Sequence, residues 1–395
     1  MSTVGAVPNL TESSRSVLRL LALRGSVTRP QLGELLNFSK PTMSTAIAEL
    51  SALGLVQSTG SLKGAMGRTA TVYGLGPGAG YVIGVDVGAA QVRVVAHALD
   101  GQQLASVETK IQRANTQTVA ATILGAVNSA IAAVGDRQTL LRVISVAVPR
   151  VVATNPLHLN KRRPPEAVLA DLRAAIGVPV LIENNVNCAA LGEWRHGAGR
   201  NRATFAFVQV GVRIGLGVVI NGQLFRGFNG AAGEIGRLPF PWSSSEAPVR
   251  EGLEHYLGSV ALMQRCVADW PKSAGPAPLT ALDLFTLAEQ GSQTALIHVD
   301  RHAADVGRLV AGLIGVLDPG LVVLGGGVGQ NPFLLKEVRR VSRDLTWSTE
   351  IEASRLGASG TVLGAVQLAI DYGLGQILGE AVHPNVVLPP LGWAG

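Results

Sequence analysis

Several hydrogen-bonding side chains lie together in one short stretch of the sequence, Glu183–Glu193, which includes Asn184 and Asn185. An apolar run, Val178–Ile182, precedes this stretch and predicts a buried strand, and a helical pattern follows it. Because open α/β sheets bind ligands at the carboxyl ends of their strands, we expect these side chains to contact a ligand. An amide such as that of Asn185 can hydrogen-bond a hydroxyl group, but it cannot accept its proton at neutral pH. The stretch therefore predicts a ligand-binding site at the end of a strand.

This stretch resembles the sugar-site signature of the ROK family, which groups repressors, open reading frames and sugar kinases. In the kinases of the family the signature reads Glu-Asn-Asp-x-Asn, and its Asp accepts the proton from the sugar hydroxyl that attacks ATP. Asn185 stands at the position of that Asp. The resemblance implies a site that binds a sugar through Asn184 and Asn185 and does not phosphorylate it. The alternative is a pair of asparagines that only caps the following helix.

Two further stretches resemble parts of the same sugar site. Gly233–Arg237 matches the family's Gly-Glu-x-Gly-His, whose Glu and His contact sugar hydroxyls; Glu234 is kept, and Arg237 replaces the His. Glu254 matches the last sugar-contacting Glu, although both glutamates could instead be solvated surface charges. The zinc-binding cysteine cluster of the family falls on Pro239–Gly252, which contains neither Cys nor His, so we expect no metal. The ligand-binding residues that the resemblance implies are Asn184, Asn185, Glu234, Arg237 and Glu254.

Three turns resemble the nucleotide loops of the actin-like ATPases, the superfamily to which ROK kinases belong. Asp86 is kept in the first loop, but Ala90 replaces its hydroxyl-bearing Thr. In the second loop, Val212 and Arg213 replace the hydroxyl residue and the central Gly. Only the adenosine-side turn, at Gly325–Gly327, keeps its glycines. Because phosphoryl transfer needs a base, phosphate loops and a magnesium site, we expect no kinase activity, no catalytic residue and no cofactor.

The first 75 residues carry a different signal. They contain seven Lys or Arg against three Glu, so they hold +4 of the formal net charge of +6. The apolar pattern predicts helices over 13–24, 29–36 and 40–53, with a break at 25–27 after the first helix. It then predicts strands over 55–59 and 69–73, joined by a Gly-rich basic loop over 60–68. Thr28–Gln31 has the layout of a capping box, and Ser39 can cap the third helix. This order predicts a winged helix-turn-helix, with a three-helix bundle and an ordinary hairpin as the alternative.

In a winged helix-turn-helix, the N-terminal residues of the recognition helix enter the major groove of DNA. The whole segment resembles the DNA-binding domain of ROK repressors, in which a wing arginine, matched by Arg68, can enter the minor groove; a narrow A·T-rich groove would attract it. We therefore expect contacts with operator DNA from the leading residues of the third helix and from the wing. These residues are Ser39, Lys40, Thr42, Ser44, Thr45, Lys63 and Arg68.

The chain divides by composition after the winged segment, because Gly74–Gly80 reads as a linker. We expect an α/β protein in which residues 1–76 form the winged helix-turn-helix domain. The resemblance, which spans about residues 13–370, implies a two-lobed actin-like ATPase fold after it, of the ROK and sugar-kinase type. We expect the first lobe over 77–190 and the second over 191–395, with the C-terminal helix returning to the first lobe.

Composition excludes several classes of protein. The 47% apolar and 15% charged content excludes a disordered chain. No uninterrupted apolar run reaches about 18 residues, and the N-terminus lacks a signal layout, so we expect a cytoplasmic protein with no membrane segment. The two cysteines, Cys188 and Cys266, are far apart in the sequence, which excludes a disulfide framework.

These observations predict a transcriptional regulator, a repressor, whose kinase-like part oligomerises and senses a sugar or a sugar derivative. We expect a homodimer or homotetramer, because one winged module rarely makes enough specific DNA contacts. Within the same class, Arg150, Asn185 and Arg237 could have remodelled the pocket, which would then bind no sugar or a phosphorylated or acidic one. An active sugar kinase is the remaining alternative, and it conflicts with Asn185 and with the altered phosphate loops.

Overall fold

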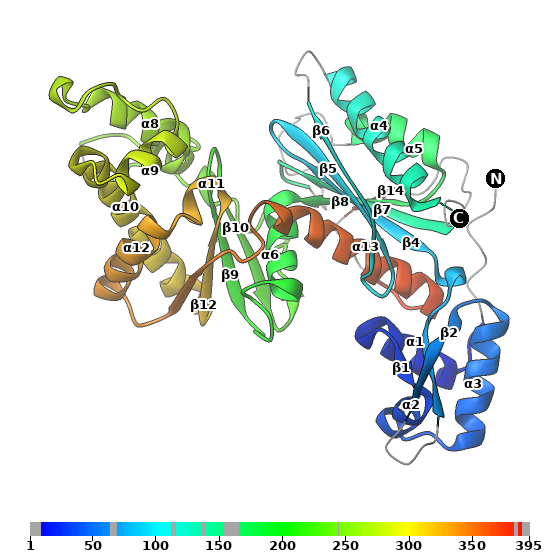
Figure 1. Cartoon of the computed structure of the whole chain (residues 1–395). Coiled ribbons are helices and arrows are strands. Elements are labelled where there is room, and N and C mark those ends of the chain that lie inside the picture. Colours follow the sequence, from blue (N-terminus) through cyan, green and yellow to red (C-terminus); the bar gives the residue numbers. More distant parts are fainter. Residues whose placement is uncertain are drawn as a thin grey trace. The chain divides into compact units, whose positions relative to one another are not determined.

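The computed structural model describes residues 9–63, 69–111, 116–135, 140–152, 166–243, 245–382 and 386–388 (Figure 1). Helices and strands alternate along most of the chain, which confirms the α/β class. The contacts divide the chain into two compact units. Unit 1 holds the described residues of Met1–Val152, Lys161–Asn185 and Ala365–Gly395, and those of unit 2 lie in Val186–Gly364. The three domains expected from the sequence, with boundaries after residues 76 and 190, stay a prediction.

Unit 1 begins with three helices and a small sheet, as expected for a winged helix-turn-helix; we call this part the winged module. Its core includes Leu18, Leu32 and Leu50, one residue from each helix, all fully buried. The sheet has the strand order β1-β3-β2, and the pairs β1–β3 and β2–β3 are antiparallel. The elements are α1 (Glu12–Arg24), β1 (Val27–Thr28), α2 (Arg29–Leu36), α3 (Lys40–Ala52), β2 (Val56–Lys63) and β3 (Thr69–Leu75).

Local sequence sets the ends of these helices as predicted. The backbone N–H of Gln31 donates to Thr28 Oγ1 (3.4 Å), and the backbone N–H of Thr28 donates to Gln31 Oε1 (3.1 Å), which completes the capping box. Ser39 Oγ accepts a hydrogen bond from the N–H of Thr42 (3.3 Å) and caps α3. Asn37, between α2 and α3, has a φ of 52°, in the left-handed region that Asn tolerates.

The wing differs from the prediction in two respects. The loop was expected to begin at Gly60, but β2 continues to Lys63. The register between β2 and β3 shifts between Ser58 and Gly60, and Gly60 has a φ of 149°, so this glycine marks a β-bulge rather than the turn. The second difference is β1, which pairs with β3 through Val27 opposite Tyr73, in a segment that the sequence had marked only as a break between helices.

The segment Gly74–Gly80, expected as a linker, is packed against its neighbours. The N–H of Gly78 donates to the carbonyl of Gly54 (2.9 Å), and a Cβ added to Gly76 would collide with the same carbonyl. Arg142 Nη2 donates to the carbonyl of Gly78 from the other side (2.7 Å). The glycines are therefore required by close backbone approach, and the segment joins the winged module to the following sheet by fixed contacts.

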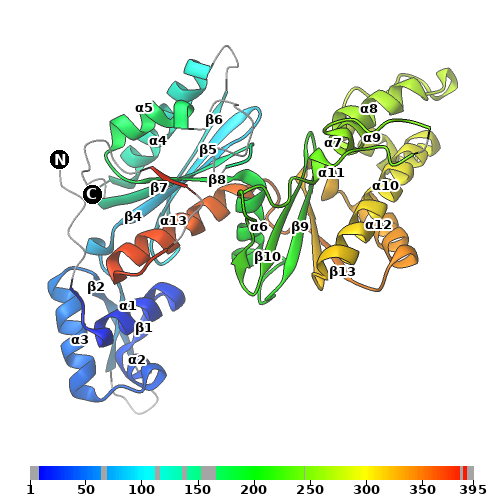
Figure 2. The same ribbon diagram turned by 180° about the vertical axis from the view of Figure 1, so that it is seen from behind.

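The rest of unit 1 is a six-stranded sheet in the order β14-β8-β7-β4-β5-β6 (Figure 2). Strands β4, β7 and β8 are parallel, and β5, β6 and β14 extend the sheet in antiparallel fashion. Helices α4 and α5 cover one face and α13 covers the other (Figures 1 and 2). The bounds are β4 (Tyr81–Val87), β5 (Gln91–Ala98), β6 (Gln103–Lys110), α4 (Thr116–Val134), β7 (Leu141–Val148), α5 (Glu166–Ile176), β8 (Val180–Asn184), α13 (Gly360–Leu378) and β14 (Val386–Leu388).

Unit 2 is built on a five-stranded sheet in the order β11-β10-β9-β12-β13. Helix α6 packs on one face so closely that a Cβ at Gly217 would collide with the side chain of Ala190. On the other face, the apolar side chains of β9, β10 and β12 join a core with α7, α8, α9, α10 and α12. The bounds are α6 (Asn185–His196), β9 (Phe205–Val210), β10 (Ile214–Ile220), β11 (Gln223–Leu224), η3 (Ile235–Arg237), α7 (Gly252–Leu257), α8 (Ser259–Ala268), η4 (Lys272–Ala274), α9 (Ala281–Glu289), α10 (Gln293–Leu317), β12 (Leu321–Gly325), α11 (Gly326–Gly329), α12 (Pro332–Leu345) and β13 (Glu350–Ala353).

The two cysteines and one apolar helix can also be compared with the expectations from the sequence. Cys188 and Cys266 are both buried, and neither forms a disulfide bond. Within the described ranges, Gly357–Leu378 is the only helical stretch with the length and apolar composition needed to cross a membrane, although the uninterrupted-run criterion had found none. In this stretch 61% of the apolar window is buried inside the protein, as in the core helix of a folded domain.

Candidate DNA-binding and ligand-binding sites

The expected DNA-contacting residues of α3 all lie on its exposed side. The helical period places Met43, Ile47 and Leu50 in the core of the winged module and leaves the residues between them in solvent. The N-terminal half of the helix is thereby lined with small polar and basic groups. The exposed residues are Ser39, Lys40, Thr42, Ser44 and Thr45.

Some of these exposed groups are oriented by neighbours, and others have none. Ser44 Oγ donates to the carbonyl of Lys40 (2.8 Å) and accepts a hydrogen bond from Arg29 of α2. The side chains of Lys40 and Thr45 make no hydrogen bond or ion pair with any residue that the structure describes. Arg29 is a basic residue at this surface that the sequence analysis assigned only to the helix start. The position of Arg29 in the first turn of α2, next to the recognition helix, could have indicated from the sequence that it belongs to this surface.

The wing is described only in part. Lys63 is the last residue of β2 and is exposed, in accordance with a contact to DNA. Arg68 lies outside the described residues, so its expected contact with the minor groove stays a prediction.

The opposite side of α3 is fixed to α1 by Glu49. Its carboxylate accepts hydrogen bonds from the N–H of Thr11 (3.0 Å), the hydroxyl of Thr11 (2.7 Å) and the hydroxyl of Ser14 (2.7 Å). Partial burial acts to raise the pKa of Glu49, but these hydrogen bonds outweigh it and lower the pKa below its ordinary value. The ionised carboxylate therefore holds the two helices together behind the exposed surface.

In unit 1, the sugar-motif residues stand where β8 ends and α6 begins. Strand β8 runs to Asn184, two residues further than the sequence predicted. Asn184 Nδ2 donates to the carbonyl of Arg150 (3.1 Å), which ties the end of β8 to the segment after β7. Glu183 is buried and accepts a hydrogen bond from the N–H of Asn184 (2.8 Å). Asn185 opens α6, and its half-buried amide makes no hydrogen bond to the part of the chain that is described.

The first phosphate-loop position is occupied by an internal ion pair. Asp86 lies near the end of β4, is only 7% exposed, and stands opposite Arg93 of β5 in the strand register. Arg93 Nη1 lies 3.5 Å from Asp86 Oδ2, and Arg93 Nε lies 3.3 Å from Glu108 Oε2. Burial raises the pKa of Asp86 to about 6, and the guanidinium of Arg93 opposes this rise. A protein cation thus stands where the resemblance implied metal-bound phosphates.

In unit 2, the structure brings Glu234, Arg237 and Glu254 together. Arg237 Nε donates to Glu234 Oε2 (2.9 Å). Burial raises the pKa of Glu234, the charge of Arg237 opposes the rise, and the charge of Glu254 adds to it. Arg213 also lowers the pKa of Glu234, which places a second guanidinium, from the altered phosphate loop, in the same cluster. No specific role for Arg213 could be predicted from the sequence.

The backbone of β10 positions this cluster. The N–H of Leu216 donates to the carbonyl of Gly233 (2.9 Å), and a Cβ at Gly233, whose φ is 84°, would collide with the carbonyl of Leu216. Gly236 lies beside Glu254, since a Cβ there would be 3.1 Å from Glu254 Oε2. Only glycine fits at these two positions, and they let the turn run directly along the strand.

The five predicted ligand-binding residues divide between the units. Asn184 and Asn185 belong to unit 1, whereas Glu234, Arg237 and Glu254 belong to unit 2, so the single sugar site expected from all five stays a prediction. Over the described ranges, no group of three or more His, Cys, Asp or Glu side chains could hold a metal ion. The segment Pro239–Gly252, where the resemblance implied a zinc-binding cluster, has no Cys or His in its sequence, and its residues therefore do not fit zinc.

Comparison with known proteins identifies the family. The ROK family profile matches residues 82–372. The chain belongs to the ROK family. The xylose repressor of Bacillus subtilis is 23% identical over 376 residues, which cover 92% of this chain and 96% of the repressor. A glucokinase of Halalkalibacterium halodurans is 31% identical over 176 residues, but these cover only 41% of this chain and 53% of the kinase.

Solved structures of the family share this fold. A ROK family transcriptional regulator, described as a homologue of the Escherichia coli MLC protein, has a TM-score of 0.72 at 19% identity and covers 92% of this chain. A ROK glucokinase from Streptomyces griseus, solved with glucose and AMPPNP, has a TM-score of 0.61 at 22% identity and covers 74%. The match to the regulator therefore covers more of this chain than the match to the kinase.

Proposed function

We propose that this chain is a DNA-binding transcriptional regulator of the ROK type, a repressor, whose kinase-like part does not phosphorylate sugars. The observation that carries this proposal is the extent of similarity. The Bacillus subtilis repressor matches 92% of the chain, whereas the glucokinase of Halalkalibacterium halodurans matches only 41%. A kinase has no need of a basic winged module, and a regulator that reads operator DNA requires one.

The DNA-binding role is supported by the chemistry of α3. Its N-terminal half offers hydroxyl groups and the ammonium group of Lys40 to solvent, and these groups suit base edges and phosphates. The partner is double-stranded operator DNA in the cytoplasm. We propose a homodimer or homotetramer, because two modules on paired half-sites double the number of contacts.

Loss of catalysis is supported at three positions. Asn185 cannot act as a base, Asp86 is paired with Arg93 instead of facing a free metal site, and Arg213 replaces the glycine of the second phosphate loop. The kinase-like part instead binds a sugar or sugar derivative as effector. The ligand changes DNA affinity to the extent that it prefers one conformation of the dimer.

A second candidate, a regulator whose pocket no longer binds sugar, is favoured by one specific observation. Oε2 of Glu234, the residue expected to contact sugar hydroxyls, already accepts a hydrogen bond from Arg237 Nε. A neutral sugar would have to compete with a charged donor for it. Replacing Arg237 with His, the residue of the family pattern, tests this point. Sugar binding that appears only in Arg237→His would establish this second candidate.

The deciding experiment is DNA binding by the full-length protein, measured by fluorescence anisotropy on fragments upstream of its own gene. The regulator assignment predicts specific binding that weakens steeply with salt and that one sugar or sugar phosphate releases. Specific binding that no sugar releases would favour the second candidate. The absence of any specific binding, together with ATP-dependent phosphorylation of a sugar, would overturn both.

A further inference from the structure

A small cavity of about 240 Å³ lies between the C-terminal half of α12 and the start of β13, within unit 2. Its volume is below the roughly 300–1,000 Å³ of sites for drug-sized ligands, so it suits an ion or the charged end of a small metabolite. Two guanidinium groups, three hydroxyl groups and one carboxylate line it. These belong to Arg339, Arg343, Ser342, Ser348, Thr349 and Glu350.

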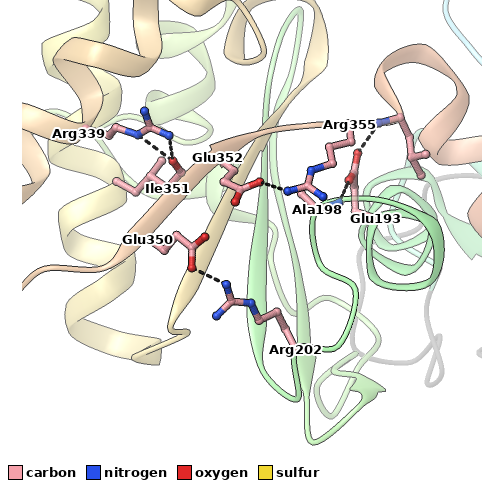
Figure 3. A network of polar contacts seen from close by, with 9 residues as sticks. Glu193, Ala198, Arg202, Arg339, Glu350, Ile351, Glu352 and Arg355 are labelled. Carbon is pink, nitrogen blue, oxygen red and sulfur yellow. Dashed lines mark hydrogen bonds and ion pairs between the residues drawn. The ribbon is translucent and has the colours of Figure 1, made fainter.

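The charged groups around this cavity differ in how many hydrogen bonds and ion pairs they make within the protein. The carboxylate of Glu350 is paired with Arg202 (Figure 3). Arg339 donates through Nε and Nη2 to the carbonyl of Ile351 (2.8 and 2.5 Å), and its Nη1 is not used in these bonds. Arg343 makes no hydrogen bond or ion pair with any of the residues described. The cavity therefore carries an excess of positive charge.

The hydroxyl of Ser342 adds a further donor to this lining. Ser342 lines the cavity, and its side chain makes no hydrogen bond with the described residues. Its hydroxyl is not one of the buried polar atoms that lack a partner, so it is open to the cavity. The hydroxyl of Ser342 and the unpaired guanidinium of Arg343 line the same cavity, and both can donate hydrogen bonds to an acceptor rich in oxygen.

The neighbouring arginine shows that this arrangement is not a general property of α12. Arg340 is fully engaged by Glu337 (2.6 Å) and Asp344 (2.8 Å), both on the same helix. A cation such as Arg343 in the last turn does complement the helix dipole. The helix dipole explains why an arginine stands at position 343, but it does not explain why Arg343 lines the same cavity as Arg339 and three hydroxyl groups.

We propose that this cavity binds a phosphate group, either as inorganic phosphate or as the phosphoryl end of a small metabolite. The planar fork of a guanidinium matches two oxygens of a tetrahedral dianion, and hydroxyl donors can satisfy the others. The proposed site is distinct from the nucleotide loops of the family. Because β12 and β13 are parallel, with Leu321 opposite Glu350, the cavity lies where both strands begin, whereas the turn Gly325–Gly327 follows the end of β12.

The segment beside the cavity leads directly to α6. After β13, Ser354 Oγ and the N–H of Leu356 donate to Glu193 Oε1 (2.5 and 3.0 Å), and Glu193 Oε2 accepts from the N–H of Ala198 (2.7 Å; Figure 3). Glu193 belongs to α6, the helix that the sugar motif opens. A phosphate that draws Arg339 away from Ile351 would thus act on a segment bonded to α6. This regulatory consequence rests on the proposed function, whereas binding does not.

The test uses thermal unfolding and calorimetry of the full chain without DNA. Sodium phosphate is compared with sodium chloride at equal ionic strength, and glucose 6-phosphate is compared with glucose. We expect phosphate to raise the melting temperature and to bind with a measurable heat, and Arg343→Gln to bind it roughly ten- to a hundredfold more weakly. Arg340→Gln, three positions away on the same helix but outside the cavity, should bind as the wild type does.

The two ligand arms separate the sources of the phosphate group. Tighter binding of glucose 6-phosphate than of phosphate would identify a metabolite site, and equal binding would identify a site for the phosphate group alone. The absence of a phosphate effect in the wild type, or the same loss in Arg340→Gln as in Arg343→Gln, would overturn the proposal. Because no DNA is present, such a failure would leave the regulator assignment untouched.

Discussion

The exposed half of α3 and the turn that carries Glu234 and Arg237 are both polar, but they differ in whether their polar side chains are paired within the protein. On α3, Lys40 and Thr45 extend into solvent without a described partner, above a helix that Glu49 fixes from behind. In the turn, the carboxylate of Glu234 is half-buried and paired with Arg237. One region keeps its donors free for a ligand, and the other satisfies its charges within the protein.

Burial explains this difference. A charge at the surface is solvated by water and needs no partner, whereas a charge removed from water is stable only when paired. Asp86 and Arg93 follow the same rule as Glu234 and Arg237. The comparison therefore teaches that Asp86 and Glu234, two acidic residues that the fold removes from water, each have a protein cation beside them, whereas the donors of α3 need none.

The largest expected effect concerns the free groups of α3. The double substitution Lys40→Ala with Thr45→Ala should weaken specific DNA binding about a hundredfold, because each contact to a base or phosphate contributes about 1–3 kcal/mol. The melting temperature should hardly change, since neither side chain has a partner within the described structure. Anisotropy titrations and thermal melts measure the two quantities. Lys272→Ala, at an exposed position in η4 of unit 2, is the control and should leave DNA affinity unchanged.

Asp86 gives the next largest effect, as a dependence of stability on pH. Burial raises its folded-state pKa from 3.8 to about 6, so the folded protein holds this proton more tightly than the unfolded chain does. Its contribution to stability is therefore full below about pH 4 and is lost as the pH rises through 6, by about 2–3 kcal/mol.

Asp86→Asn should remove this part of the pH dependence. Urea unfolding midpoints between pH 4 and 7.5 measure it, and Asp300→Asn, at an exposed position on α10, is the matched control. If Asp86→Asn kept the wild-type dependence of stability on pH, burial would not raise the pKa of the paired Asp86 carboxylate. Burial would then not explain the difference between the two regions.

A smaller effect is expected for the support behind α3. Glu49→Gln weakens three hydrogen bonds to Thr11 and Ser14 and should destabilise the winged module by about 1–2 kcal/mol. Since the folded pKa of Glu49 is lowered, its contribution is present above the unfolded value of about 4.3 and disappears as the pH falls through the lower folded value. Hydrogen exchange of α1 amides measures the loss. Glu34→Gln, exposed on α2, should not produce it.

The smallest effect is expected where a substitution introduces only one part of the family's kinase pattern. Asn185→Asp supplies the missing base, but Arg93 still pairs with Asp86 and Arg213 still replaces a phosphate-loop glycine. We expect no phosphorylation of any sugar in an ADP-release assay, with an active ROK glucokinase as the positive control. Measurable turnover by this single variant would show that the ion pairs do not close the site to ATP.

Much of the winged module could be predicted because its signals are local. The capping box at Thr28, the N-cap at Ser39 and the apolar period of three helices each involve residues within a few positions of one another. Strand β1 was missed because two residues carry no period and pair with β3 more than forty positions away. Gly60 was misread because a glycine can mark either a turn or a bulge, and only the strand register separates the two.

For the candidate sites, the sequence indicated which residues take part more readily than which residues contact one another. The opposition of Asp86 and Arg93 follows from the hairpin register, which one sequence does not specify until the turn length is known. The bonds from Ser354 and Leu356 to Glu193 join positions 161 and 163 residues apart, and no pattern in the chain announces them. Family resemblance supplied Glu234 and Glu254, but the arrival of Arg213 beside them required the fold.

The packed glycine segment after the winged module bears on how such proteins exchange parts in evolution. A recombination event that joins a foreign winged module after residue 76 would bring its own helix end against Gly78 of the recipient, where the carbonyl of residue 54 leaves no room for a side chain. Gly78 is held from the other side by Arg142, which also comes from the recipient. A successful graft must therefore carry matched residues on both sides of the cut, so the DNA-binding specificity and the sheet that follows it are expected to be inherited together.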